Sequence, residues 1–255
     1  MDTNKIIHLA ANAGKLMLEN GGETYRVEET IDRICKAYGL HEADSFVTTT
    51  GIILSVRDEY GQTTSIVRRI KIRKVDLEKV SLLNDFSRNI TVRGLTSDEV
   101  NEELLKIDNT KKYSNNTKVL FSSLGAAFFT LLFGGNIFDF LVSFFVGGII
   151  VWCSIRLSNI KVNDFFINTL GGAMAAILAI IAVHFKLGSH VDKIIIGSIM
   201  LLVPGLAITN AIRDTISGDL LAGISRAVEA FLIAVAIAVG SGIVLRLWFI
   251  YYGGI

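Results

Sequence analysis

Apolar residues follow two different patterns along this chain of 255 residues. Up to about residue 112 they recur at helical or alternating spacing with polar residues between them, whereas from Val119 onward they form long runs. The first pattern is typical of elements that bury one face in a soluble core, and runs of about 20 apolar residues can cross a bilayer. The chain therefore divides into a predicted soluble domain, residues 1–112, and a predicted transmembrane domain, residues 113–255.

The predicted soluble domain combines helices and strands. Helical spacing predicts helices over about 3–18, 23–38 and 76–90, and β-branched residues predict strands over 45–57 and 63–72. Thr96 and Glu99 have the spacing of a capping box, which predicts a further helix that begins there. We therefore expect an α-helical membrane protein in which a cytoplasmic α+β domain precedes a bundle of about five transmembrane helices.

Five apolar runs are candidates for membrane spans, at about 117–134, 137–156, 165–186, 191–209 and 220–250. The fourth run is short and contains Pro204 and Gly205, and proline ends or kinks a helix because it lacks a backbone donor. Small residues recur at a four-residue spacing that lets helices pack closely in lipid. They are Gly171, Ala175 and Ala179 in the third run and Ala230, Ala234 and Ala238 in the fifth.

Charged residues are concentrated in the first part of the chain, where residues 1–118 hold 18 Lys or Arg and 18 Asp or Glu. Such an even balance differs from a basic nucleic-acid surface, so no nucleic-acid partner is expected. Lys111, Lys112 and Lys118 precede the first apolar run, and no secretory signal is visible. The positive-inside rule therefore favours a multi-pass protein of the cell membrane with a cytoplasmic N-terminus.

The usual signatures of enzymes are absent from the sequence. It contains no G-x-S-x-G, no G-x-x-x-x-G-K-[ST], no H-E-x-x-H, no C-x-x-C and no G-x-G-x-x-G. The four histidines share no metal-ligand spacing, and Cys35 and Cys153 lie far apart. We therefore expect no catalytic residues, no metal, no cofactor and no enzyme activity.

Polar and charged residues gather within 204–229, directly after the interrupted fourth run. A charge at the bilayer centre costs about 2.5–3.5 kcal/mol on the insertion scale, so these groups must pair, lie at the interface or line a wet cavity. Many transporters build substrate sites at broken helices with polar residues at the break. An ordinary loop whose charges mark the membrane edge is the alternative.

Two blocks of sequence resemble the threonine/serine exporter family. One is VPG-x-x-x-TNAIRD-x-x-x-GDLLAGISR-x-x-EA, and the other is GGETYRVEETIDRICKAYGL followed by VTTTGIILSV. The resemblance extends over nearly the whole chain. It implies one subunit of a secondary exporter of threonine and serine or of a dicarboxylate such as succinate, driven by an ion gradient. It also implies the long subunit of a split transporter, which assembles in the lipid bilayer with a short five-span partner subunit into an oligomer.

The resemblance implies roles only at matching positions. For substrate binding these are Thr209, Asn210, Arg213 and Arg226; for proton coupling, Asp214, Asp219 and Glu229; for the helix break, Pro204 and Gly205. In the N-terminal block the matching polar residues are Glu23, Thr24, Arg26, Glu28, Thr48 and Thr50. They are candidates for a gate or a regulatory pocket, but helix capping and strand formation are an adequate structural explanation. Arg213 is the best candidate for a substrate carboxylate, because its guanidinium can bind one bidentately.

Two other functions remain open at this point. A membrane-anchored hydrolase would place catalysis in the N-terminal domain, although no nucleophile–base pair is visible there. A sensor or scaffold would use the apolar half only as an anchor, for which a single helix is enough.

Overall fold

The computed structural model describes residues 3–253, and the chain divides into two compact units. Unit 1 contains the chain up to Lys111 together with Leu206–Ala227. Unit 2 contains Lys112–Gly205 together with the chain from Val228 onward. The polar segment that follows Pro204 thus belongs with the N-terminal elements, and the two units are described separately below.

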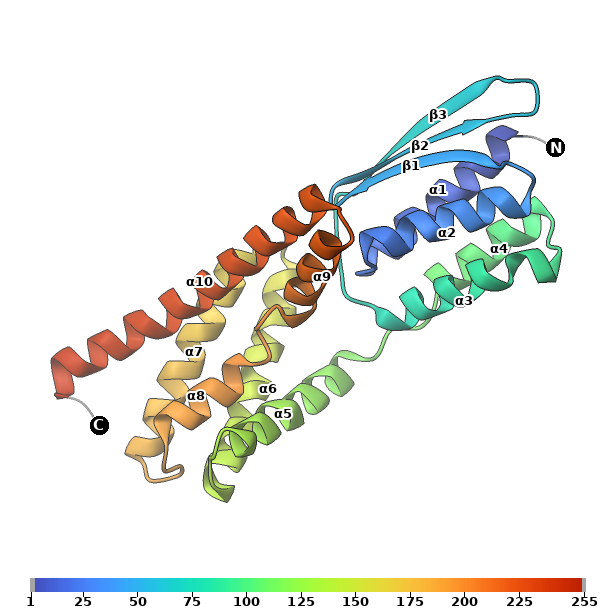
Figure 1. The fold of residues 1–255 in the computed structure, drawn as a ribbon. Helices are drawn as coiled ribbons and strands as arrows, with labels where there is room; N and C mark the ends of the chain where they lie inside the picture. The colour runs from blue at the N-terminus through green and yellow to red at the C-terminus, as the bar shows by residue number, and fades with distance from the viewer. Residues whose placement is uncertain (1–2, 254–255) are drawn as a thin grey trace. The chain divides into compact units, whose positions relative to one another are not determined.

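Unit 1 is a layered α+β structure (Figure 1). Its elements in chain order are α1 (Thr3–Glu19), α2 (Thr24–Ala37), β1 (Glu42–Thr48), β2 (Gly51–Arg57), β3 (Thr63–Arg69), α3 (Leu77–Arg93) and α4 (Ser97–Asp108), followed by most of α9 (Gly205–Ile216) and the first turns of α10 (Leu220–Tyr252). The strands form an antiparallel sheet in the order β1-β2-β3. Helices α1 and α2 cover one face of this sheet, and α3 and α4 pack on the other side of those two helices.

The core of unit 1 follows from the two periodicities of the sequence. On β2, Ile52, Leu54 and Val56 alternate with more exposed residues and are fully buried against the helices. Helix α2 places Val27 and Ile31 in the same core. Each such side chain stabilises the fold by about 1.5–3 kcal/mol through burial.

The expected capping box is present, since the Thr96 hydroxyl accepts from the Glu99 backbone N–H and the Glu99 carboxylate accepts from the Thr96 backbone N–H. This local motif begins α4 as the sequence predicts.

The single strand expected over 45–57 is wrong. The chain reverses at Thr49 and Thr50, so that Thr48 pairs with Gly51 and two strands form instead of one. The Thr48 hydroxyl stabilises the turn by accepting from the Thr50 backbone N–H at 3.4 Å and donating to the Gly51 carbonyl at 3.3 Å. Three consecutive threonines suit a strand, and the turn lacks the Asn-Gly or Asp-Gly pair that marks a tight hairpin. The next strand also ends earlier than expected, at Arg69.

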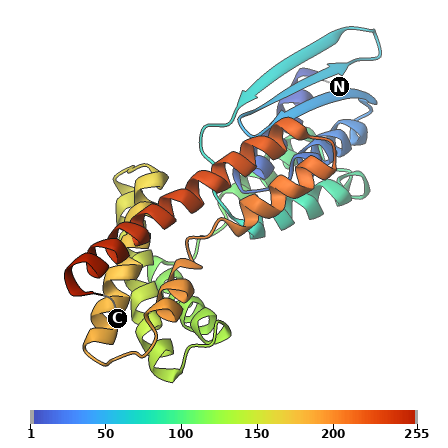
Figure 2. The same cartoon turned by 60° about the vertical axis from the view of Figure 1, so that its left-hand side comes forward.

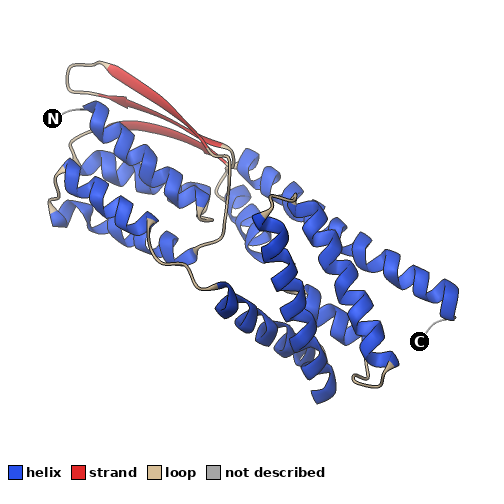
Figure 3. Cartoon of the chain, turned by 180° about the vertical axis from the view of Figure 1, so that it is seen from behind, coloured by secondary structure: helices blue, strands red, loops and turns tan. Residues whose placement is uncertain are grey.

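Unit 2 is helical, and in the described part of the chain the strands lie only in unit 1 (Figure 3). Its helices are α5 (Asn115–Leu132), α6 (Ile137–Asn159), α7 (Asp164–His184), α8 (Val191–Ile199) and most of α10 (Leu220–Tyr252). Among the described residues, three helices are long and apolar enough to cross a membrane, at Ile137–Asn159, Asp164–His184 and Leu220–Tyr251. These features are those of a mostly helical integral membrane protein.

The count of five spans stays a prediction. Helix α5 begins with four polar residues, Asn115 to Lys118, and α8 has only nine residues. The fourth apolar run is not one helix, because α8 ends at Ile199, residues 200–204 are not helical, and α9 (Gly205–Ile216) begins after Pro204. The missing backbone donor of proline explains the interruption.

Close packing of α7 and α10 uses other small residues than expected. A Cβ on Gly172 would collide with the backbone carbonyl of Ile237, so the two helices touch there. The expected stripe is buried at Gly171, Ala175 and Ala179 on α7 and at Ala230 on α10, whereas Ala234 and Ala238 on α10 are exposed. The small residues of the fifth run therefore pack only in part within this chain, because a four-residue spacing does not by itself tell which face of a helix meets its neighbour.

Candidate functional site

The candidate site is built on the turn between α1 and α2. Gly21 has a φ of +99°, which a glycine adopts without strain. A Cβ on Gly22 would lie 2.7 Å from the Met17 side chain, so the turn can close on α1 only with a glycine there. Glu23 then takes an extended conformation and precedes the first turn of α2.

Four consecutive residues of this turn each bind a different residue from α9 or α10. The Gly21 carbonyl accepts from Asn210 Nδ2 at 3.0 Å, and the Gly22 carbonyl accepts from Arg226 Nη2 at 2.9 Å. Glu23 Oε1 accepts from Arg213 Nη1 at 2.6 Å, and the Thr24 backbone N–H donates to Asp214 Oδ1 at 3.1 Å. Accordingly, α9 and the first turns of α10 lie beside the start of α2 (Figure 2). Residues from both sequence blocks therefore form one site within unit 1.

Asp214 and Arg226 form a buried ion pair at the centre of the site. Their side chains are 0% and 6% exposed, and Asp214 Oδ2 lies 2.9 Å from Arg226 Nε. The carboxylate also faces the N-terminus of α2, where the helix dipole favours a negative charge. Helices α9 and α10 approach closely enough to form the pair because Gly223 has no side chain. A Cβ at this position would collide with the Thr215 hydroxyl.

Glu23 links two arginines at the accessible edge of the site. Its Oε2 lies 2.8 Å from Arg26 Nε, while its Oε1 accepts from Arg213. Burial acts to raise the pKa of Glu23, but its backbone hydrogen bond and the two guanidinium groups outweigh that effect and lower it. The Arg213 side chain is 52% exposed, whereas that of Glu23 is 10% exposed. Arg213 is thus an accessible cation held by an internal carboxylate.

A pair of carboxyl groups lies close to the buried ion pair. Burial, and then the charge of Asp214, raise the pKa of Asp219. Burial, and then the charge of Asp219, raise the pKa of Glu28, although a hydrogen bond from the Val47 backbone N–H opposes this. Both groups therefore hold a proton at a higher pH than an ordinary carboxyl does.

The remaining predicted residues lie at different places. Thr209 is exposed on α9, and Pro204 and Gly205 lie directly before and at the start of that helix. Glu229 is half-buried on α10 in unit 2. Thr48 is the last residue of β1, and Thr50 lies in the turn between β1 and β2.

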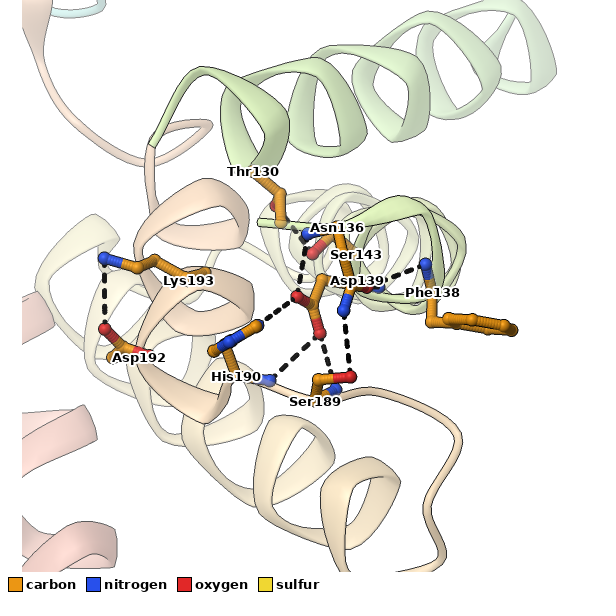
Figure 4. Close-up of polar contacts among 9 residues, drawn as sticks. All are labelled: Thr130, Asn136, Phe138, Asp139, Ser143, Ser189, His190, Asp192 and Lys193. Atoms are coloured by element: carbon orange, nitrogen blue, oxygen red, sulfur yellow. Dashed lines mark hydrogen bonds and ion pairs between the residues drawn. The ribbon is translucent and has the colours of Figure 1, made fainter. Parts of the chain in front are cut away.

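Unit 2 contains a polar cluster around Asp139 that the sequence analysis missed (Figure 4). The Asp139 carboxylate is fully buried and accepts from the backbone N–H groups of Asn136, Ser189 and His190. Its Oδ2 also lies 2.7 Å from Nδ1 of His190. The cluster therefore joins the start of α6 to the start of α8. The signal for it in the sequence is the three-residue spacing of Asn136 and Asp139, which form a capping box like that of α4.

A second polar contact lies near this cluster. The Thr130 hydroxyl of α5 donates to the Ser143 hydroxyl of α6 at 2.6 Å, and both residues are buried. These contacts satisfy polar groups between helices and explain how α5 and α6 pack.

Comparison with known proteins decides the family. The ThrE family model, which describes a threonine/serine exporter, matches residues 8–248. This chain belongs to the threonine/serine exporter family. It is 24% identical over 251 residues to the probable threonine/serine exporter of Mycobacterium tuberculosis, an alignment that covers 96% of this chain and 47% of that protein. It is 24% identical to the threonine/serine exporter of Corynebacterium glutamicum, over 95% of this chain and 51% of that protein.

A second group of relatives in the family is matched over nearly its whole length. The probable succinate transporter subunit YjjP of Klebsiella aerogenes is 23% identical over 252 residues, which cover 95% of this chain and 94% of that protein. By contrast, the chain spans about half the length of the two exporters above. No solved structure matches.

These relatives are named as transporters, and they give no support to the hydrolase alternative. The residues that the structure describes contain no group of three or more His, Cys, Asp or Glu placed to hold a metal ion.

Proposed function

We propose that this chain is a subunit of a secondary exporter of small polar metabolites, either threonine and serine or a dicarboxylate such as succinate. The family membership and the names of the relatives support export. The match to proteins named as succinate transporter subunits supports a role as one subunit. As its partner we propose a short five-span protein of the same family. Three apolar helices support an integral position in the membrane, and we place the N-terminus in the cytoplasm.

The observation that carries this proposal is the ion pair between Arg213 and Glu23. Arg213 is the accessible cation of the site, and a carboxylate of the protein occupies its guanidinium. A substrate carboxylate offers the same two oxygens, so it competes with Glu23 for Arg213. Glu23 keeps Arg26 as a partner when it is displaced, which limits the cost of opening the pair.

The buried residues of the site have a different proposed role. Asn210, Asp214 and Arg226 are almost inaccessible, and each of them forms a hydrogen bond with the turn at Gly21–Thr24. We assign them to positioning this turn and Glu23 rather than to direct binding of substrate. Thr209, which is exposed one residue before Asn210, remains a candidate for substrate hydroxyl or amino groups.

Among the three acidic candidates for proton coupling, Asp219 is favoured. Asp214 is engaged by Arg226 and the Thr24 backbone, which stabilises its charged form. Asp219 instead has a raised pKa and a second carboxyl, Glu28, close to it. A proton taken up there weakens the repulsion between the two carboxyl groups, which links protonation to the α2–α10 contact. Glu229 lies further along α10 and stays a second candidate.

The test is efflux of labelled serine, threonine and succinate from proteoliposomes, with and without a co-reconstituted short partner. Arg213→Ala should abolish efflux, whereas Arg33→Ala is the matched control. Arg33 forms an equally short ion pair with Glu29, at 2.6 Å, on α2 outside the site. Normal efflux by Arg213→Ala would remove this residue from the substrate site, and equal loss in both variants would show a general effect on folding.

A further inference from the structure

The connection from β3 to α3 carries an unusual concentration of positive charge. Five of the 18 Lys and Arg in residues 1–118 lie within seven positions, 68–74, with the sequence RRIKIRK. Between Glu59 and Asp76 there is no acidic residue. The rest of this part of the chain mixes both signs, so the segment differs from an ordinary solvated surface.

Apolar side chains are exposed within the same segment. All five residues from Lys71 to Val75 are exposed, with Ile72 at 66% and Val75 at 67%. Leu77, at the start of α3, is exposed as well. Exposed β-branched residues between cations combine the two properties with which peripheral segments bind a charged bilayer, namely electrostatic attraction and shallow apolar insertion.

The segment is held in place by the backbone next to the candidate site. The Lys74 backbone N–H donates to the Glu19 carbonyl at 2.7 Å, and the Asp76 backbone N–H donates to the Asn20 carbonyl at 3.0 Å. A Cβ on Gly21 would lie 3.4 Å from both the Lys74 carbonyl oxygen and the Leu206 side chain. The exposed side chains of Lys71, Arg73 and Lys74 therefore belong to a connecting segment whose backbone is bonded to the end of α1, next to the site turn.

We propose that residues 71–75 form a docking segment for an anionic phospholipid surface. The cations contact lipid phosphates, and Ile72 and Val75 enter the headgroup region. Such docking would fix the neighbouring turn at Gly21–Thr24 relative to the bilayer, which the site needs if substrate is to pass from Arg213 into the membrane part. A nucleic acid would also attract the cations, but it would leave the two exposed aliphatic side chains without a partner.

The test places a fluorophore on the segment in the full chain. In a Cys153→Ala background the remaining native cysteine is Cys35, which is fully buried. Burial raises the pKa of its thiol to about 12, so a thiol-reactive dye labels an introduced exposed cysteine instead. Ile72→Cys and Val75→Cys are labelled and reconstituted in vesicles of phosphatidylcholine, alone or mixed with phosphatidylglycerol. In both cases part of the lipid carries brominated acyl chains as quenchers.

Quenching at positions 72 and 75 should appear with phosphatidylglycerol and decrease in high salt, which screens surface charge. The control Tyr60→Cys lies at the other end of β3, about 23 Å away for seven residues of strand, and should not be quenched. Changing Lys71, Arg73 and Lys74 to Gln should lower the ratio of docked to undocked segment about fivefold per cation, or about a hundredfold together. Continued protection of Cys35 shows that this variant is folded.

Absence of quenching in both lipids, or equal quenching in both, would overturn the proposal. A fluorescence change with an RNA oligonucleotide but not with anionic vesicles would also overturn it, in favour of nucleic-acid binding. The assay does not measure export, so its result is independent of the proposed function.

Discussion

Removal of one partner from the Asp214–Arg226 pair should destabilise unit 1 strongly. Both side chains are almost fully buried, so Asp214→Ala takes the carboxylate at 2.9 Å away from a buried guanidinium, and Arg226→Ala takes the guanidinium away from a buried carboxylate. Breaking such a pair costs about 3–5 kcal/mol. At 1.4 kcal/mol per factor of ten, even the lower limit increases the open population of unit 1 about 150-fold.

Cys35 provides the assay for this opening. Its thiol lies on α2, the helix that starts at the site turn, and it is fully buried with a pKa raised to about 12. In a Cys153→Ala background, the rate at which a thiol reagent modifies Cys35 tracks the open population when reclosing is faster than modification. We expect each single variant to raise this rate at least about a hundredfold.

The control is the exposed ion pair between Lys5 and Asp98, whose atoms are 2.7 Å apart. Asp98→Ala should change the rate less than about fivefold, because exposed pairs contribute about 0–1 kcal/mol. The double variant Asp214→Leu/Arg226→Met removes both charges and should be less destabilised than either single variant. Two single variants with wild-type rates, or a double variant equal to the sum of the two, would refute this reasoning.

Three further predictions use the pKa shifts and the cluster in unit 2. The stability that ionised Glu23 contributes is present above its ordinary pKa of about 4.5 and is lost as the pH falls through its lower folded-state pKa. Glu23→Gln should therefore reduce the fall of the melting temperature at acid pH, and an unchanged pH profile would contradict this. The raised pKa of Asp219 makes its contribution decrease as pH rises above 3.8 through the folded-state pKa. Asp219→Asn should therefore raise the melting temperature at neutral pH while export loses its dependence on a pH gradient, and retained coupling would exclude Asp219 as the proton carrier. Asp139→Ala leaves three backbone N–H donors and His190 without their acceptor, so it should lower the free energy of unfolding by about 3 kcal/mol or more and lower the melting temperature accordingly. His190→Ala removes only a half-exposed partner and should lower the free energy of unfolding by less.

Much of the architecture could be predicted because it depends on local signals. The α4 capping box involves residues three positions apart, and the spacing of apolar residues predicts α1, α2 and α3. The error at Thr49 and Thr50 shows the limit of such signals, since a turn of two β-branched residues has the composition of a strand. Local signals also could not give the number of spans. The run interrupted by Pro204 has the same hydropathy whether its two halves form one continuous helix or two separate helices.

The sequence by itself determined that one half of this chain is apolar enough for lipid, that the other half forms an α+β structure, and which residues carry charge beside the helix break. Only the tertiary structure decided which partners those charges have. Asp214 and Thr24 are 190 positions apart, as are Arg213 and Glu23, and no local pattern encodes a contact over that distance. A buried charge must find an opposite charge or a hydrogen bond, but many groups along the chain can satisfy that need, and the packing of α2, α9 and α10 selects among them.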